Sequence, residues 1–225
     1  MDVIKTIWAG LDWSVLTDML MRILPALLCI TLHEMGHGYA ALWLGDTTAK
    51  DRGRLSLNPI RHIDPMGLVM MVVFRFGWAR PVPINMYRFK NPKRGMAITA
   101  LAGPVSSILL GVVMLLLYGF LFPLGDSMIG TFLLTIVATS AYLSLSLGVF
   151  NLLPVPPLDG SKVLFSLLSD EAYERLMRYE RYGMVLLIVL LSSGILRTPL
   201  SNITEWLFDR LFVLAEWSYG IVMHQ

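Results

Sequence analysis

Two histidines and a glutamate stand close together in the segment TLHEMGHGYAALWLG, which covers residues 31–45. His33 and His37 are four residues apart, so a helix would place both imidazoles on one face, where they can bind a single zinc ion. Glu34 lies beside the line of the two ligands, where it can hold a water molecule without binding the metal itself. The H-E-x-x-H pattern therefore indicates zinc-dependent peptide hydrolysis, with Glu34 as the general base.

The same two histidines have a simpler interpretation, as core side chains that hydrogen-bond to neighbouring helices. The segment around them is otherwise apolar and has the character of a membrane helix. Ionisable side chains inside a membrane are rare and usually serve a function. This setting favours the metal-binding interpretation.

A catalytic zinc site needs a third protein ligand in addition to a water molecule. His62 lies in a basic loop and His224 lies next to the C-terminus, so we expect both to be solvated. Asp159 is better placed, because it follows three prolines in the stretch NLLPVPPLDG and precedes Gly160. Prolines end a helix and glycine permits a turn, so the carboxylate can be aimed inward. The residues alone leave a metal ligand and an ordinary turn aspartate equally open for Asp159.

The composition is that of a membrane protein. Of the 225 residues, 56% are hydrophobic and 15% are charged, whereas soluble domains have about a quarter charged residues. The stretch 96–122 is too long and too uncharged for a soluble core. The sequence contains no low-complexity tract, internal repeat or long soluble stretch. We therefore predict a single membrane-embedded domain over residues 1–225, surrounded by lipid and without a nucleic-acid partner.

The one cysteine of the chain, Cys29, excludes an internal disulfide. It lies one helical turn before His33 on the same face, so a thiolate ligand is conceivable. We expect a small packing residue instead.

We predict an all-α polytopic membrane protein with about four to six membrane segments. Full spans are expected at 15–45, 96–122 and 129–150, since about 20 apolar residues cross the hydrocarbon core. Shorter or more mixed segments follow at 182–196 and 199–223.

A region of a different kind is expected between the first and second full spans. Residues 66–76 are apolar but too short to cross as a helix, so we predict a short or re-entrant segment. The stretches GRLSLN (53–58) and ARPVPIN (79–85) on either side fit short β-strands.

Basic residues lie on both sides of residues 66–76, and the positive-inside rule assigns them to the cytoplasm. They are Lys50, Arg52, Arg54, Arg61, Arg88, Lys90, Lys93 and Arg94. The chain then runs outward through 96–122 and returns through 129–150. Asp159 and the histidine-bearing end of the first span are thus expected near the cytoplasmic side, with the N-terminus outside.

The segment HEMGH inside the first apolar span, followed by NLLPVPPLDG after a later span, resembles the site-2 protease family of intramembrane zinc metalloproteases. The stretches FGWARPVPIN and NPKRGMAITALAGPVSS are also similar to its bacterial members, and the resemblance covers roughly residues 25–170. It implies one zinc ion per chain, held by His33, His37 and Asp159, with Glu34 as the catalytic base. It also implies a multi-pass protein of a bacterial or archaeal inner membrane, with an active site open to the cytoplasm.

The resemblance further implies a substrate and a residue that holds it. The family cleaves a peptide bond within or near the transmembrane helix of another membrane protein, which would be the partner of this chain. Asn151 matches an asparagine ahead of the Asp-Gly turn that is thought to help hold the substrate. Larger family members carry a PDZ or CBS domain, so we expect this chain to be a minimal core.

One position departs from the family pattern G-P-x-x-N, because Ser107 stands where asparagine is frequent. Gly103, Ser107 and Gly111 are also four residues apart, and small residues at that spacing let membrane helices pack closely. We therefore expect Ser107 to serve helix packing.

Peptide hydrolysis within lipid needs a wet cavity and an unwound substrate, because a helix hides its carbonyls in its own hydrogen bonds. The two predicted strands offer an edge that can hold the unwound chain by β-augmentation. Their alternative role is to brace residues 66–76.

Two other functions fit the same polar residues. One is a non-catalytic relative that binds and retains membrane proteins. The other is a metal or ion transporter that uses His33, His37 and Asp159 as a transit site. The intact Glu34 and the lack of a repeated half favour the peptidase over both.

Overall fold

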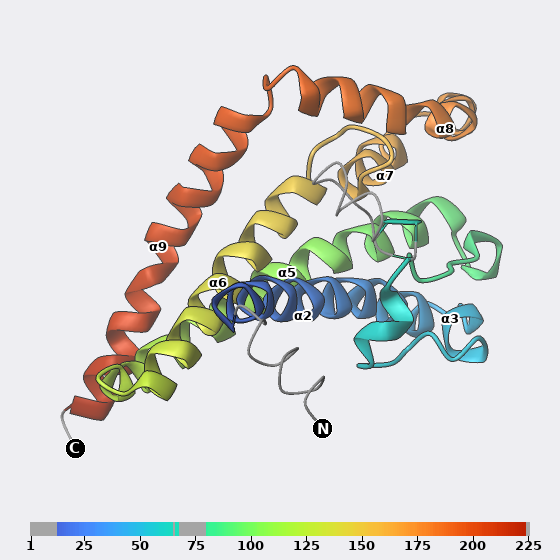
Figure 1. Ribbon diagram of the computed structural model, residues 1–225. Helices are drawn as coiled ribbons and strands as arrows, with labels where there is room; N and C mark the ends of the chain where they lie inside the picture. Colours follow the sequence, from blue (N-terminus) through green and yellow to red (C-terminus); the bar gives the residue numbers. More distant parts are fainter. Residues whose placement is uncertain (1–12, 65, 68–79, 224–225) are drawn as a thin grey trace, which may run out of the picture.

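The computed structural model describes residues 13–64, 66–67 and 80–223, and the regular structure in them is almost entirely helical (Figure 1). The longer helices are α2 (Trp13–Trp43), α5 (Pro92–Leu121), α6 (Met128–Asn151), α7 (Asp159–Ser166), α8 (Asp170–Ser192) and α9 (Arg197–Met223). The shorter helical turns are α3 (Thr48–Asp51), η1 (Pro59–His62), η2 (Met86–Arg88) and η3 (Phe122–Leu124). The expected all-α class is therefore confirmed for the described residues.

Two of the described helical stretches are long and apolar enough to cross a membrane: Pro92–Leu124, with 33 residues, and Met128–Asn151, with 24 residues. The helices Tyr182–Ser192 and Arg197–Met223 add a third crossing if they count as one broken span, with a bend of 84° between them. The expected four to six segments are thus not reached in the described residues. α2 has 31 residues and is not among these stretches.

Local sequence explains where α5 and α6 begin and end. The Asn91 side chain accepts a hydrogen bond from the Arg94 N–H at 3.0 Å, and a proline occupies the first turn of α5. The hydroxyl of Ser127 accepts a hydrogen bond from the Gly130 N–H at 3.0 Å and caps α6 in the same way. α6 ends at Asn151, because the proline-rich turn that follows cannot continue a helix.

α5 lies at the centre of the molecule and packs against α2, α6, α7 and α9 (Figure 1). Glycines set the spacing of these helices. A β-carbon at Gly36 of α2 would lie 2.5 Å from the Ser106 hydroxyl of α5, and one at Gly111 of α5 would lie 2.6 Å from the Leu145 side chain of α6. Both distances are too short for a real β-carbon, so the small residues of α5 allow the close packing expected for them.

The two predicted strands are wrong in the part of the chain that the structure describes. Residues 53–58 form a turn followed by irregular backbone, and residues 80–85 have no regular structure. Pro81 and Pro83 explain the second case, because a proline has no N–H to donate to a β-ladder. Of the expected re-entrant segment 66–76, only residues 66–67 are described, and they are helical.

His62 also differs from the prediction, which was a solvated side chain. It is buried, with 2% of its surface exposed, and its Nε2 atom lies 2.9 Å from the Ser56 carbonyl. Its own carbonyl accepts a hydrogen bond from the Arg80 N–H at 2.8 Å, next to an isolated β-bridge at Ile63. The histidine therefore joins the two loop segments that flank residues 66–76.

Candidate metal centre

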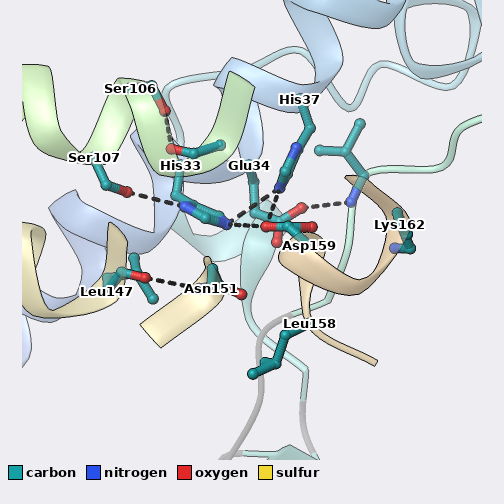
Figure 2. A network of polar contacts seen from close by, with 12 residues as sticks. His33, Glu34, His37, Ser106, Ser107, Leu147, Asn151, Leu158, Asp159 and Lys162 are labelled. Atoms are coloured by element: carbon teal, nitrogen blue, oxygen red, sulfur yellow. Dashed lines mark hydrogen bonds and ion pairs between the residues drawn. The ribbon is translucent and has the colours of Figure 1, made fainter. Parts of the chain in front are cut away.

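His33 and His37 of α2 meet Asp159 of α7 in the interior of the molecule (Figure 2). The Nε2 atoms of the two histidines lie 3.2 Å apart. The Oδ2 atom of Asp159 lies 3.2 Å from Nε2 of His33 and 3.1 Å from Nε2 of His37. All three side chains are buried. The structure thus brings together the three residues proposed as ligands, and their role as ligands stays a prediction.

The position of Asp159 follows from the way α7 begins. α7 starts at Asp159, directly after the proline-rich turn. A β-carbon at Gly160 would overlap the Leu152 carbonyl at the end of α6, so only glycine allows the first turn of α7 to pack there. The close approach of the Leu152 carbonyl requires a glycine here. Gly160 is not among the glycines with a positive φ, so backbone conformation is not the reason. The contact leaves the Asp159 carboxylate facing the histidines of α2.

The donor atoms of this cluster fit a single cation. The Nδ1 atom of His37 lies 2.7 Å from the Thr99 carbonyl, which only accepts hydrogen bonds, so Nδ1 carries the proton and Nε2 of the neutral ring presents a lone pair. That lone pair faces Nε2 of His33 and a buried Asp159 oxygen without a hydrogen-bond partner. Ligand atoms in a tetrahedral zinc site lie about 3.3–3.4 Å apart. The separations of 3.1 and 3.2 Å are close to that arrangement.

Two carboxyl groups have pKa values below their ordinary range. Asp159 belongs to the cluster, and Asp46 contacts the end of the segment 80–85. Burial raises the pKa of Asp159, but its contacts with His33 and His37 lower it by more. Burial likewise raises the pKa of Asp46, but the N–H of Asn85, which donates to its carboxylate at 2.6 Å, and further hydrogen bonds outweigh that effect. Both side chains are therefore carboxylates at neutral pH, and Asp46 fixes the end of the segment 80–85.

A second layer of contacts orients the two imidazoles. Nδ1 of His33 lies 2.9 Å from the Ser107 hydroxyl, and Nδ1 of His37 contacts the Thr99 carbonyl. Ser107 is itself held in place, because the Ser144 hydroxyl donates to its carbonyl at 2.8 Å. Such contacts fix the ring orientation of metal-binding histidines. Ser107 is fully buried, as expected for a packing residue, and its hydroxyl also forms a polar contact with the imidazole of His33.

Gly103 of α5 lies against the faces of the two histidines. A β-carbon at this position would overlap the His37 ring and would lie 2.8 Å from Cε1 of His33. α5 therefore contributes to the centre by lacking a side chain at this point, and any larger residue would displace the imidazoles.

Glu34 does not belong to the three-residue cluster, although it lies beside it (Figure 2). Its Oε2 atom accepts a hydrogen bond from the Val82 N–H at 2.7 Å. Val82 lies in the segment 80–85, which passes along one side of the centre. The carboxylate is thus held at the wall of the site by a backbone donor from a loop distant in sequence.

A cavity of about 190 Å³ joins these groups. Its lining comprises the three residues of the cluster, Glu34 and part of the segment 80–85. Asn151 at the end of α6 and Lys162 of α7 also line it. The Asn151 amide donates one hydrogen bond to the Leu147 carbonyl at 3.0 Å. Lys162 is a residue of the site that was not among the predicted ones. Its position three residues after Asp159, on the same face of α7, was the available signal.

Cys29 lies outside the cluster, as expected for a packing residue. It is buried, with 2% of its surface exposed, and its thiol donates to the Ser140 carbonyl of α6 at 3.4 Å. His62 belongs to the loop after α2, and His224 lies outside the described residues.

The fold and the site together define a helical protein with at least two helices of membrane-spanning length and a buried centre of two histidines and one carboxylate. The model of Peptidase family M50 matches residues 125–192, which include Asp159. YwhC of Bacillus subtilis, named as a zinc metalloprotease, is 36% identical over 187 residues, which cover 82% of this chain and 83% of YwhC.

Two further relatives also carry the name zinc metalloprotease. Rip2 of Mycobacterium tuberculosis is 32% identical over 189 residues, covering 81% of this chain and 71% of Rip2. MJ0392 of Methanocaldococcus jannaschii is 30% identical over 159 residues, covering 71% of this chain and 36% of MJ0392. No solved structure shows a significant match. The chain belongs to peptidase family M50, the site-2 protease family that the sequence motifs indicated.

Proposed function

We propose that the protein is a zinc endopeptidase that hydrolyses a peptide bond within or near the transmembrane helix of another membrane protein. One observation carries this proposal: His33, His37 and Asp159 converge in a buried cavity that also holds the carboxylate of Glu34. The family and the relatives named as zinc metalloproteases support the chemistry. Two helices of membrane-spanning length in the same molecule support a substrate within the bilayer.

His33, His37 and Asp159 are the proposed zinc ligands. When bound, zinc supplies a water molecule whose pKa is lowered to about 7 and a Lewis acid for the scissile carbonyl. The contacts with Ser107 and with the Thr99 carbonyl keep the Nε2 atoms of the two histidines directed at the ion.

Glu34 is the proposed general base. Its carboxylate accepts a proton from the attacking water and then returns that proton to the leaving amine. The hydrogen bond from Val82 occupies Oε2, while the other carboxylate oxygen has no hydrogen-bond partner within the described residues. The arrangement therefore orients Glu34 and leaves one oxygen available for the proton.

Asn151 is the proposed substrate-holding residue. It lines the same cavity, and one N–H of its amide bonds to the Leu147 carbonyl. A primary amide has a second N–H, which is available for the backbone of the substrate or for the oxyanion that forms during attack. Lys162 adds a positive charge to the same wall and lies 3.8 Å from Glu180 of α8.

The segment 80–85 is the surface that an unwound substrate would meet first. Its two prolines have no N–H, and the N–H groups of Arg80, Val82 and Asn85 bond within the protein. The N–H of Ile84 is thus the one backbone donor left in these six residues, all of which the structure describes. Binding of a substrate to this segment would rely mainly on its carbonyl oxygens as acceptors.

We place the protein in the inner membrane of a bacterium or an archaeon, with its cavity open to the cytoplasm. The basic residues between α2 and α5 support this orientation, because cytoplasmic loops are enriched in Lys and Arg. The relatives in bacteria and in an archaeon support the assignment to these organisms.

The test is the amount of zinc per chain in the purified, detergent-solubilised protein. We expect about one zinc ion in the wild type and much less in Asp159→Ala. Asp126→Ala is the matched control, because Asp126 is an exposed carboxylate in the turn before α6. Equal zinc in the wild type and Asp159→Ala would remove Asp159 from the site.

Glu34→Gln distinguishes the peptidase from the transporter. The peptidase variant keeps its zinc and loses hydrolysis of a membrane-protein substrate by about 10²- to 10⁴-fold. A transporter would keep its metal flux in the same variant, and a non-catalytic relative would show no hydrolysis in the wild type.

A further inference from the structure

Four arginines surround a hollow of about 750 Å³ on the surface formed by the loops after α2. Arg52, Arg54 and Arg61 come from residues 52–61, and Arg80 begins the segment that passes Glu34. The remaining lining residues are one glycine and two prolines, so no acidic side chain contributes to the hollow within the described residues.

The four positive charges have no carboxylate in ion-pair contact among the described residues, although the charge of Glu34 acts on Arg54 from beyond that distance. Among the described residues, none of the four arginines forms an ion pair. Arg61 donates a hydrogen bond to the Gly53 carbonyl, and Arg54 donates to the Arg80 carbonyl at 2.8 Å. The Nε atom of Arg54 is buried without a partner. By contrast, Arg88, outside the hollow, lies 3.4 Å from the Asp51 carboxylate.

The clustering has an electrostatic consequence for Arg54. Burial and the neighbouring charge of Arg80 lower the pKa of the Arg54 guanidinium from its ordinary value. Like charges this close repel, and an anion in the hollow would relieve that repulsion. Guanidinium groups match phosphate oxygens with two parallel hydrogen bonds, so phosphate is the anion that this set suits best.

Exposed apolar side chains occur in the same stretch of chain as three of the arginines, residues 52–61. Leu55 packs inward, where it contacts Gly38 of α2, whereas Leu57 is 67% exposed and Ile60 is 73% exposed. Trp43, at the end of α2, is 85% exposed. Exposed large apolar residues in the same loop as arginines, and exposed tryptophans at helix ends, are typical of a surface that lies at the membrane interface.

We propose that this arginine hollow binds the phosphate of an anionic phospholipid headgroup, with Leu57 and Ile60 placed in the acyl-chain boundary beside it. The charge of the hollow alone would also suit an acidic peptide. The exposed apolar residues favour lipid. An acidic peptide bound in the hollow would gain no affinity from Leu57 and Ile60, which face outward, whereas the acyl chains of a lipid would contact them. Clusters of arginine next to a membrane helix attract anionic lipids electrostatically.

The lipid would also act on the catalytic segment. Arg54 holds the carbonyls of Arg80 and Pro81, at 2.8 and 3.4 Å, and the next residue donates its N–H to Glu34. A headgroup that draws the arginines together therefore stabilises the segment that orients Glu34. This second consequence rests on the proposed peptidase function, whereas the binding itself does not.

The experiment measures lipid retained by the zinc-loaded protein in native mass spectrometry, from micelles with equal amounts of phosphatidylglycerol and phosphatidylcholine. The test variant is Arg52→Gln/Arg61→Gln, which leaves the Arg54 contacts to residues 80–81 intact. The control is Lys50→Gln/Lys90→Gln, which removes the same charge from exposed positions outside the hollow. We expect the wild type and the control to retain phosphatidylglycerol, and the test variant to bind it about tenfold more weakly.

Two further measurements, with glycerol phosphate and with a short acidic peptide, distinguish a lipid headgroup from other anionic ligands. Glycerol phosphate at millimolar concentration should compete only weakly, because it lacks the acyl chains that contact Leu57 and Ile60. Equal retention by the wild type and the arginine variant would overturn the proposal. It would also be overturned if glycerol phosphate or a short acidic peptide bound at this hollow while phosphatidylglycerol did not. The zinc content of each variant reports on the metal site separately, so a failure of lipid binding is distinguishable from a failure of the peptidase proposal.

Discussion

The backbone N–H of Val82 donates a hydrogen bond of 2.7 Å to the carboxylate of Glu34, and this contact joins the segment 80–85 to the H-E-x-x-H helix. The donor is a main-chain group, so it does not depend on the side chain at position 82. Prolines on both sides of Val82 limit the backbone freedom of the donor. The loop therefore acts as a fixed support for the proposed base.

Val82→Pro removes the donor and leaves the metal cluster untouched. We expect hydrolysis to fall by about 10- to 100-fold, because a misplaced catalytic group loses orientation. Zinc should stay near one ion per chain. Val82→Ala keeps the N–H and is the control, with activity close to that of the wild type. If Val82→Pro also loses zinc, the segment serves the structure of the site and not the orientation of Glu34.

Ser107→Ala removes the contact with Nδ1 of His33. The imidazole then loses the group that fixes its orientation, and we expect zinc affinity to fall by about 10- to 100-fold. Competition with a chelator of known affinity measures this change. Ser106→Ala is the control, because that hydroxyl bonds to the carbonyls of Leu32 and Gly103 and to neither histidine. Equal zinc affinity in both variants would show that Ser107 serves packing alone.

Gly103→Ala places a methyl group where the His37 ring lies. Overpacking of this kind costs about 1–3 kcal/mol of stability, and here it also displaces a proposed ligand. We expect substoichiometric zinc and a lower midpoint of thermal unfolding in detergent. A β-carbon at Gly220 meets no atom within 4 Å, so Gly220→Ala tests the same substitution in open space. A fully zinc-loaded Gly103→Ala variant would contradict the geometry of the centre.

The lowered pKa of Asp46 predicts how the stability of the folded protein depends on pH. Its pKa is depressed in the folded protein, where its carboxylate accepts hydrogen bonds from the N–H groups of Asn85 and Thr48. A depressed carboxyl pKa adds stability above the unfolded value of about 3.9, and this stability is lost as the pH falls through the lower folded value.

Asp46→Asn should therefore be less stable than the wild type at pH 6 by about 1–3 kcal/mol, with the difference shrinking toward pH 3. Thermal unfolding of both proteins in detergent between pH 6 and pH 3 measures this difference in stability. Exposed Asp170→Asn serves as the control. A difference that stays constant with pH would mean that ionisation of Asp46 does not stabilise the loop.

The local part of the site could be predicted from the sequence. The spacing of His33 and His37 places them on one helical face, and the prolines before Asp159 end α6 and allow a new helix to start there. The structure brings these three residues together. Spacing and helix breakers are local signals, and they act through backbone geometry that does not depend on the rest of the fold.

The contacts between distant segments could not be predicted in the same way. Nothing in the sequence around Ser107 or Val82 indicates that these residues touch His33 or Glu34. The strand prediction for residues 79–85 relied on composition, whereas the backbone donors of the described part, residues 80–85, bond to side chains and to another loop. Burial of His62 depends on the Ser56 carbonyl, which is a tertiary contact as well.

The convergence of His33, His37 and Asp159 has a thermodynamic consequence. His33 and His37 belong to the first described helix and Asp159 to a helix much later in the chain, so a cation shared by them cross-links two helices that are distant in the sequence. A ligand that binds only the folded state stabilises it by an amount that grows with the logarithm of its free concentration. The melting temperature of this protein should thus rise with free zinc. Chelation would loosen the contact between α2 and α7 first, because no shared cation would then join the Asp159 carboxylate to the two histidines.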